Sequence, residues 1–464
     1  MTEPDPKPGA PAGKSQPEEA DRLRELLRSP GYLKVLVLCA LIGVPVSLAA
    51  FWFLVALHQL NHLMWADLPE AVGLAAPPWW WPLPLLPAAG IVVGLVVTHL
   101  PGGGGHIPAG GLHATGGSPR ALPGVMLAAL ASLPLGATLG PEAPLIAFGG
   151  GLALLVTELA RVPSTAQSTI LLGTAGAAAA VSVIFGNPLI AAVMVMEVAG
   201  VGGSRLFAVM LPALLSSGVG ALVFTGFGRW TGLKTSHLSM ELGVPFPRLD
   251  AGDVVWSVLI AVAIGVAVHL ITLGGRLTAL FVARRPLANT AVCALASGAC
   301  AAVYALVTGR SPVEVASSGQ ATLSHMAAEP HAWGVGALIA VLLFTGLSYT
   351  LCLGSLRGGP VFPALFLGGA AGVLLAPLPG LGVVPGLAVG MAAAVTSALR
   401  LPVSSVVLIV LLLDSAAMIP VVILASVVAF VTTQLLPPGR AVPEAGKPVD
   451  PSGGATQAAD AAGP

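Results

Sequence analysis

Charged side chains are scarce in this sequence. Asp, Glu, Lys and Arg together make up 9% of the 464 residues, whereas an ordinary soluble domain carries about 25%. So few charges cannot cover the surface of a water-soluble globule, and hydrophobic residues reach 56% of the chain. The composition therefore indicates a polytopic protein embedded in a lipid bilayer, which we expect to be the plasma (inner) membrane.

Several functional classes also lack their signatures. The formal net charge is zero, and no basic cluster is long enough to suggest a nucleic-acid partner. The four cysteines (Cys39, Cys293, Cys300 and Cys352) lie in apolar stretches without metal-type spacing, so we interpret them as packing residues. Because no nucleophile motif or phosphate-binding loop is present, we predict neither an enzyme nor a cofactor.

What the chain has in abundance is apolar segments of unequal length. A membrane-spanning helix needs about 20 mainly apolar residues. Clear candidates are 33–57, 82–100, 206–227, 254–274, 288–308, 332–353 and 417–436. Shorter apolar pieces are 121–137, 144–160, 168–185, 188–199, 361–376, 383–399 and 402–414. Short pieces bounded by Gly or Pro predict helices that stop inside the membrane, where protein or a watery cavity covers the broken backbone.

Charges and tryptophans near the segment ends predict the orientation. Arg and Lys residues precede the first long segment, whereas Trp79, Trp80 and Trp81 follow an acidic loop. The positive-inside rule then places both termini in the cytoplasm and the Trp-rich loop outside. We predict a disordered cytoplasmic arm (1–30), a first membrane repeat (31–229), an external linker (230–252), an inverted second membrane repeat (253–436) and a disordered tail (437–464).

A repeated motif marks the two halves of the chain. Residues 140–150 and 359–369 share the pattern Gly-Pro-x-x-Pro-x-x-x-x-Gly-Gly. A second repeated spacing follows each copy of the motif. Gly176 precedes Pro188 by twelve residues, and Gly390 precedes Pro402 by the same interval. Apolar segments broken by Gly and Pro at corresponding positions of two halves predict a binding site near the bilayer midplane.

The first copy of the motif carries a carboxylate, Glu142, where the second copy carries Val361. Glu142 follows Pro141 at the expected start of a helix, where free N–H groups and the helix dipole favour an anion. The carboxylate could take the place of that anion and leave when it is protonated or displaced. The alternative is that Glu142 only caps its own helix, but carboxylates inside membranes are functional by default.

The glycine-rich stretch 101–110 is a weaker signal. It offers a string of backbone N–H groups on a loop before a possible short helix, although a simple turn would have the same composition. His106 within it has two interpretations, a structural or interfacial residue and a pH sensor.

Four short motifs in this order resemble the CLC family of chloride channels and chloride/proton exchangers. They are Gly-Gly-His-Ile-Pro (104–108), Gly-Pro-Glu-Ala-Pro (140–144), Asn-Pro-Leu (187–189) and Gly-Gly-Pro-Val-Phe-Pro (358–363). The resemblance covers about residues 33–436 and implies an inverted repeat with broken helices meeting at mid-membrane. It further implies a homodimer with one anion pathway per subunit, chloride as the default substrate, and voltage gating as in the channels.

The resemblance also carries site residues over to this chain. Glu142 corresponds to the gating position, and the implied anion-binding residues are Gly105, His106, Ile107, Glu142, Ala143, Val361 and Phe362. Several departures predict a weaker or differently selective central site. Gly105 stands where the family has a serine, and Pro360 lacks the N–H of a coordinating amide. None of the three tyrosines lies near the C-terminal position of the family's pore tyrosine.

A further departure concerns proton coupling. Family exchangers carry two successive carboxylates after the Asn-x-Pro-Leu motif, and here Glu197 matches the first while Val198 matches the second. The apolar Val198 resembles the channels and removes the implied proton entry, so we interpret Glu197 as structural and predict a passive or glutamate-gated chloride channel. The alternatives are an anion/proton antiporter with another internal route and an inverted-repeat transporter of an organic or cationic solute. Asp414 has a family counterpart but no predicted transport role.

Arg357 lies immediately before the second broken helix. Its guanidinium could attract anions or pair with Glu142. Alternatively, it is an interfacial arginine neutralised by the C-terminus of a helix.

Overall fold

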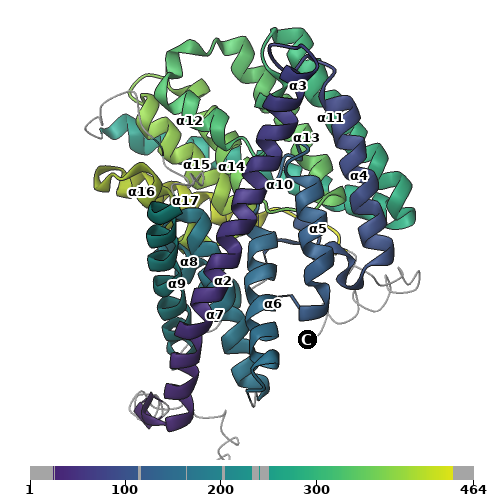
Figure 1. Cartoon of the computed structure of the whole chain (residues 1–464). Helices are drawn as coiled ribbons and strands as arrows, with labels where there is room; N and C mark the ends of the chain where they lie inside the picture. The colour runs from purple at the N-terminus through teal and green to yellow at the C-terminus, as the bar shows by residue number, and fades with distance from the viewer. Residues whose placement is uncertain are drawn as a thin grey trace, which may run out of the picture.

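The computed structural model describes residues 24–25, 27–112, 117–162, 165–200, 204–231, 240 and 250–442 (Figure 1). Its helices are α2 (Pro30–His62), α3 (Leu68–Ala71), α4 (Pro82–His99), α5 (Leu122–Ser132), α6 (Glu142–Leu159), α7 (Ala166–Phe185), α8 (Pro188–Ala199), α9 (Ser204–Thr231), α10 (Ala251–Arg284), α11 (Pro286–Thr308), α12 (Gln320–Ala328), α13 (Val335–Ser355), α14 (Val361–Leu375), α15 (Val383–Leu399), α16 (Pro402–Leu413) and α17 (Ile419–Leu435). The predicted all-α fold is confirmed for this part of the chain. Most of the predicted arm, linker and tail lies outside the described residues.

Nine helices in the described part are long and apolar enough to cross a membrane. They include all seven predicted long segments. The prediction was wrong for α6 and α7, which reach 18 and 20 residues and so qualify as well. α7 extends beyond the apolar run because Thr165 and Ser168 form a capping box at its start. The helices α8, α14, α15 and α16 are shorter, as expected for helices that stop within the membrane.

Glycine contacts hold one matching pair of helices together in each repeat. In the first half, α6 packs on α7, and a Cβ atom on Gly149 would collide with the backbone of Gly176. In the second half, α14 packs on α15, and a Cβ atom on Gly368 would collide with the backbone of Gly390. Small residues allow such close backbone approach between membrane helices. The repeated glycines of the sequence are therefore matched helix crossings of the two repeats.

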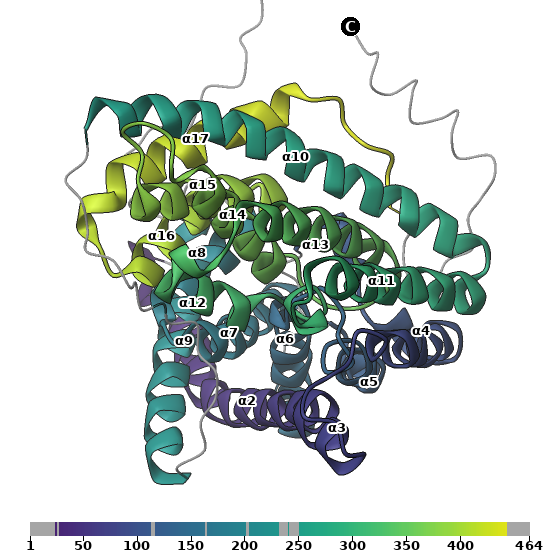
Figure 2. The ribbon, with the colours of Figure 1, turned by 90° about the horizontal axis from the view of Figure 1, so that it is seen from above.

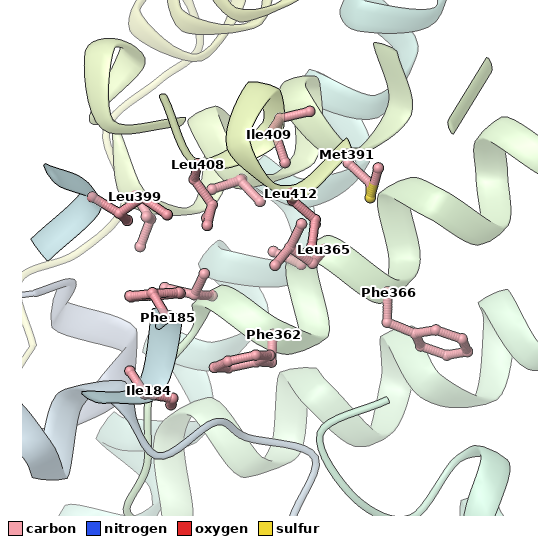
Figure 3. Packing of buried hydrophobic residues seen from close by; sticks show 14 of the residues in the cluster. Ile184, Phe185, Phe362, Leu365, Phe366, Met391, Leu399, Leu408, Ile409 and Leu412 are labelled. Atoms are coloured by element: carbon pink, nitrogen blue, oxygen red, sulfur yellow. The ribbon is translucent and has the colours of Figure 1, made fainter. Parts of the chain in front are cut away.

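These two helix pairs lie in the middle of the molecule. Figure 2 shows α6, α7, α14 and α15 inside a surround that includes α2 on one side and α10 with α17 on the other. Between the pairs, the rings of Phe185 and Phe362 are stacked, with centroids 6.0 Å apart and an angle of 10° between their planes (Figure 3). Leu365 and Leu412 are buried nearby in the same cluster. The apolar core thus fixes the ends of the helices on which the site is built.

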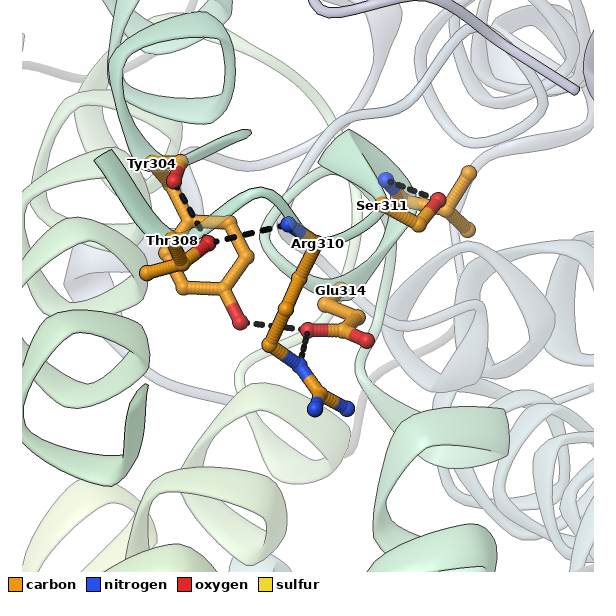
Figure 4. Close-up of polar contacts among 6 residues, drawn as sticks. Tyr304, Thr308, Arg310, Ser311 and Glu314 are labelled. Carbon is orange, nitrogen blue, oxygen red and sulfur yellow. Dashed lines mark hydrogen bonds and ion pairs between the residues drawn. The ribbon is translucent and has the colours of Figure 1, made fainter. Parts of the chain in front are cut away.

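A polar cluster pins the connection between α11 and α12 (Figure 4). Tyr304 donates a hydrogen bond to Glu314, and Arg310 forms a 2.8 Å ion pair with the same carboxylate. The guanidinium also lies 3.8 Å from the ring centroid of Trp333. The hydrogen bond to Glu314 raises the pKa of Arg310 above its usual value. This cluster fixes a loop that lines the larger of the two cavities described below.

Candidate functional site

The two copies of the repeated motif meet at the centre of the protein. The N–H of Gly140 donates to the carbonyl of Gly359 over 2.8 Å, and the N–H of Gly359 donates back over 2.5 Å. This pair forms an isolated antiparallel bridge. Since α6 begins at Glu142 and α14 at Val361, the N-termini of both helices lie together. The family resemblance implied such a meeting point, and the broken segments themselves predicted a binding site near the bilayer midplane.

The carboxylate of Glu142 lies at this meeting point. The residue is 0% exposed, and its Oε1 accepts a hydrogen bond from the N–H of Val361. The backbone N–H groups of Phe362 and of Glu142 itself also face the carboxylate. Oε2 is buried without a hydrogen-bond partner among the described residues. Glu142 therefore does more than cap its own helix, because its charge sits on the N-terminus of α14, the kind of place that binds anions.

The two glycines of the bridge make room for this carboxylate. A Cβ atom on Gly359 would overlap the carboxyl carbon and Oε1 of Glu142, and a Cβ atom on Gly140 would overlap Oε2. Neither glycine has a positive φ angle. Their role is thus to leave space for the side chain of Glu142, and an unusual backbone conformation is not the reason for glycine at either position.

Two cavities adjoin the site. The large cavity, about 650 Å³, extends from His58 on α2 to the loop before α12 and reaches Leu139 and Pro141. Among the described residues that line it, none is Asp, Glu, Lys or Arg. The small cavity is lined by Ala143 and Pro144, which follow Glu142 in the chain, together with Gly104, Gly105, His106 and Arg357. Glu142 lines neither cavity and lies between the residues that line them.

The glycine-rich loop has a reason for its composition. Residues 102–105 are four successive glycines with φ between 55° and 93°, a region that other residues rarely adopt. The prediction that this loop offers a string of free backbone N–H groups is wrong in part, because the N–H of Gly105 donates to the carbonyl of Gly102 over 2.9 Å. Gly105 and His106 line the small cavity. Ile107 is not among its lining residues, and its carbonyl accepts a hydrogen bond from Gly110.

The second copy of the motif presents its backbone to the site. The ring of Phe362 stacks on Phe185, and the backbone N–H of Phe362 faces the carboxylate of Glu142. The carbonyl of Pro360 accepts a 2.8 Å hydrogen bond from the hydroxyl of Tyr349 on α13. Sequence comparison with the family pointed to the C-terminus for a tyrosine and so missed Tyr349. The available signal was a tyrosine inside an apolar helix, whose hydroxyl needs a partner when buried.

Arg357 is 4% exposed and lies between α13 and α14. Nε and Nη2 each donate to the carbonyl of Gly103 over 3.3 Å, and Nη1 donates to the carbonyl of Leu356 over 3.3 Å. No carboxylate of the described residues lies within the 4.0 Å that defines an ion pair. Pairing with Glu142 is therefore wrong. The hydrogen bond to Leu356, the C-cap of α13, agrees with the alternative in which the C-terminus of a helix neutralises the guanidinium.

The carboxylate of Glu197 caps a helix of the other repeat. It accepts hydrogen bonds from the N–H groups of Val403 (3.0 Å) and Ser404 (2.7 Å) and from the Ser404 hydroxyl (2.5 Å) at the start of α16. Val198 packs against the apolar core. Asp414 ends α16 in a left-handed conformation with φ of 48°. The geometry of Glu197 and Asp414 is that of helix capping.

The four cysteines are buried and free. Within the described part of the chain, no group of three or more His, Cys, Asp or Glu side chains could hold a metal ion. The site is therefore built from backbone amides, one carboxylate and one guanidinium.

Comparison with known proteins agrees with this architecture. A family model described as "Voltage gated chloride channel" matches residues 89–434. YfeO of Salmonella newport (strain SL254), named as a candidate ion-transport protein, is 26% identical over 344 residues, which cover 72% of this chain and 78% of YfeO. YfeO of Escherichia coli O7:K1 is 25% identical over 354 residues, covering 74% and 80% of the two chains.

Solved structures share the fold at lower identity. A slow cyanobacterial Cl⁻/H⁺ antiporter gives a TM-score of 0.69 with 18% identity, over 86% of this chain and 94% of that chain. A CLC-type fluoride/proton antiporter gives 0.65 with 19% identity, over 87% and 96% of the two chains. A eukaryotic CLC transporter gives 0.64 with 17% identity, over 88% and 72%.

Proposed function

Because the chain belongs to the voltage-gated chloride channel (CLC) family, we propose that it carries small anions, chloride by default, along a pathway that the carboxylate of Glu142 closes. One observation carries this proposal, the hydrogen bond from the N–H of Val361 to Oε1 of Glu142. A helix N-terminus that binds a carboxylate offers the same donors to a free anion. Protonation or displacement of Glu142 would leave them available.

The proposed pathway runs from the large cavity past Glu142 to the small cavity. We call the place where Glu142 separates the two cavities the closed point. It is short, because Pro141 lines one cavity and Ala143 lines the other. The absence of Asp and Glu from the lining of both cavities favours anions over cations. The proposed anion contacts are the amides of Val361 and Phe362 at the closed point, and the loop of Gly105, His106 and Ile107 beyond it.

We propose a channel without proton coupling. Val198 cannot bind a proton, and the carboxylate of Glu197 is held by three hydrogen bonds to the start of α16. Neither residue is suited to deliver protons to Glu142. The second candidate is an anion/proton antiporter, which the buried and titratable Glu142 favours, and two solved structures with this fold are named as antiporters.

The oligomeric state, the membrane and the topology that we propose are based on the family and on the positive-inside rule. We propose a homodimer with one pathway per subunit in the plasma membrane, with both termini in the cytoplasm. The repeat boundaries proposed from the sequence, 31–229 and 253–436, place one member of the motif pair in each half. The function is transport rather than catalysis.

The test is anion efflux from proteoliposomes, with the pH recorded at the same time, for wild type and Glu142→Gln. Glutamine keeps the size of the side chain but removes the charge that competes for the helix N-terminus. We expect faster efflux that no longer depends on pH. Glu158→Gln is the matched control, because Glu158 is a solvent-exposed glutamate near the other end of the same helix.

Unchanged flux and unchanged pH dependence in Glu142→Gln would overturn the gating role. Uphill proton movement at a fixed ratio to the anion would replace the channel by the antiporter. An ion series with chloride, nitrate, fluoride and bromide in the same assay ranks the substrates.

A further inference from the structure

The buried guanidinium of Arg357 has no assigned role in the pathway as proposed. It lies 96% buried in the short connection between the end of α13 at Ser355 and the start of α14 at Val361. Its neighbours in the lining of the small cavity are Gly105, His106 and Ala143. Arg357 therefore contributes a positive charge to the same cavity that adjoins Glu142.

The charge of Arg357 is incompletely compensated by the protein. Its hydrogen bonds to Gly103 and Leu356 are all 3.3 Å long, whereas charge-assisted N–H···O bonds are usually about 2.7–2.9 Å. No carboxylate of the described residues is within ion-pair distance. The C-terminus of α13 supplies roughly half an elementary charge at most. A buried cation without a counter-ion is strongly unfavourable, so an anion in the cavity would relieve it.

The guanidinium also keeps donors for such an anion. Arginine has five N–H groups in a planar fork. Three are used, by Nε and Nη2 to Gly103 and by Nη1 to Leu356, which leaves one N–H on Nη1 and one on Nη2. Two donors on one rigid plane match two oxygens of a planar oxyanion.

The cavity itself is narrow. The space open to the centre of a water-sized sphere is about 10 Å³, near the lower limit for one water molecule. An anion larger than water must therefore both lose most of its water and widen the cavity as it enters. Replacement of that water is what the two remaining N–H groups can provide. The donors that the family resemblance led us to expect are absent, since Gly105 has no hydroxyl and Pro360 has no N–H.

We propose that Arg357 binds the transported anion in the small cavity, and that its planar fork makes nitrate, a planar oxyanion, a better substrate than chloride. This inference rests on the proposed anion pathway. It assigns to one side chain the hydrogen-bond donors that the serine and the amide provide in the CLC family, and it adds a positive charge that neither of them carries. The selectivity of the pathway is then set by Arg357, and Glu142 controls its opening.

The test is calorimetric titration of purified full-length protein with sodium chloride and with sodium nitrate, together with efflux of both anions from proteoliposomes. Variants are Arg357→Gln and Arg357→Lys. Arg276→Gln is the matched control, because Arg276 is half-buried, donates to the carbonyl of Gly439 over 3.2 Å and does not line the small cavity. We expect Arg357→Gln to lower the affinity for both anions at least about tenfold. Arg357→Lys should keep chloride binding but lose the preference for nitrate, because an ammonium group lacks the planar fork.

Arg357 also holds the loop at Gly103, so the glutamine variant could misfold. Wild-type protein then decides the question, since an anion that binds only the folded state raises the melting temperature as its concentration increases. A wild-type melting temperature that does not respond to nitrate overturns the proposal. So does a folded Arg357→Gln protein with wild-type affinity, or a nitrate preference that persists in Arg357→Lys. If anion efflux from wild type is absent, the pathway itself fails, whereas efflux with unaltered selectivity in both variants refutes only the role of Arg357.

Discussion

Replacing Gly359 by alanine tests the position of the Glu142 carboxylate without touching Glu142. The added Cβ atom would overlap the carboxyl carbon and Oε1 of Glu142. Because φ of Gly359 is not positive, the backbone itself accepts alanine. The side chain of Glu142 is the flexible partner in this collision, so we expect the carboxylate to leave the N-terminus of α14.

The magnitude follows from the contact that is lost. Displacement breaks the hydrogen bond from Val361 to Glu142, and a hydrogen bond to a charged group contributes about 1.5–3 kcal/mol. Since 1.4 kcal/mol is a factor of ten, the population of the open pathway should rise about tenfold to about a hundredfold. The assay is initial anion efflux from proteoliposomes at alkaline pH, where the proposed gate requires the wild-type carboxylate to be charged and in place.

A second alanine and a double variant make the result specific. Gly346→Ala, on α13, adds a Cβ atom that only touches Ile271 at 3.6 Å, so its efflux should equal that of wild type. In Gly359→Ala combined with Glu142→Gln, the two effects should not add, because both act through one carboxylate. Folded Gly359→Ala protein with wild-type efflux and wild-type pH dependence would show that the carboxylate does not occupy the closed point.

Two further predictions concern stability. Glu197→Gln should lower the melting temperature, because its carboxylate caps the first turn of α16, while the pH dependence of efflux stays at the wild-type value; a change in that pH dependence would contradict the structural role. Arg310→Gln should also lower the melting temperature, by the same amount at mildly acidic and mildly alkaline pH. The pKa of Arg310 is raised in the folded protein, so its contribution is complete below the unfolded pKa and is lost only as the pH rises past the folded value. Thermal unfolding at several pH values measures it, and a loss of the effect near neutral pH would refute the pairing.

Much of the fold was predictable because glycines and prolines define the motif that is repeated in the two halves of the chain. The pattern shared by residues 140–150 and 359–369 predicted two broken helices and a binding site between the repeats, and the family resemblance implied that the helices meet. The structure brings Gly140 and Gly359 into hydrogen-bonding contact. The second repeated spacing begins at Gly176 and Gly390, and both glycines lie where two helices cross. Glycine at such positions serves close backbone approach, which is a local requirement that sequence spacing can reveal.

The hydrogen-bond partners of several site residues could not be predicted. Arg357 bonds to Gly103, 254 residues earlier in the chain, and no local pattern specifies that contact. The hydroxyl of Tyr349 reaches Pro360 because α13 leads back to the start of α14, a tertiary arrangement. The internal hydrogen bond of Gly105 follows from the left-handed backbone of four glycines, and the sequence indicates only that such a backbone is possible.

The bridge between Gly140 and Gly359 bears on how fast ions can cross. It joins the two repeats by a pair of backbone hydrogen bonds at the closed point itself. Rocking one repeat against the other would have to break both bonds, and collective motions of that kind take microseconds to milliseconds. Rotation of a single side chain is far faster once space is available. A pathway that opens by moving only Glu142 can therefore turn over at rates that rocking transporters do not reach, and single-channel currents would be within its range.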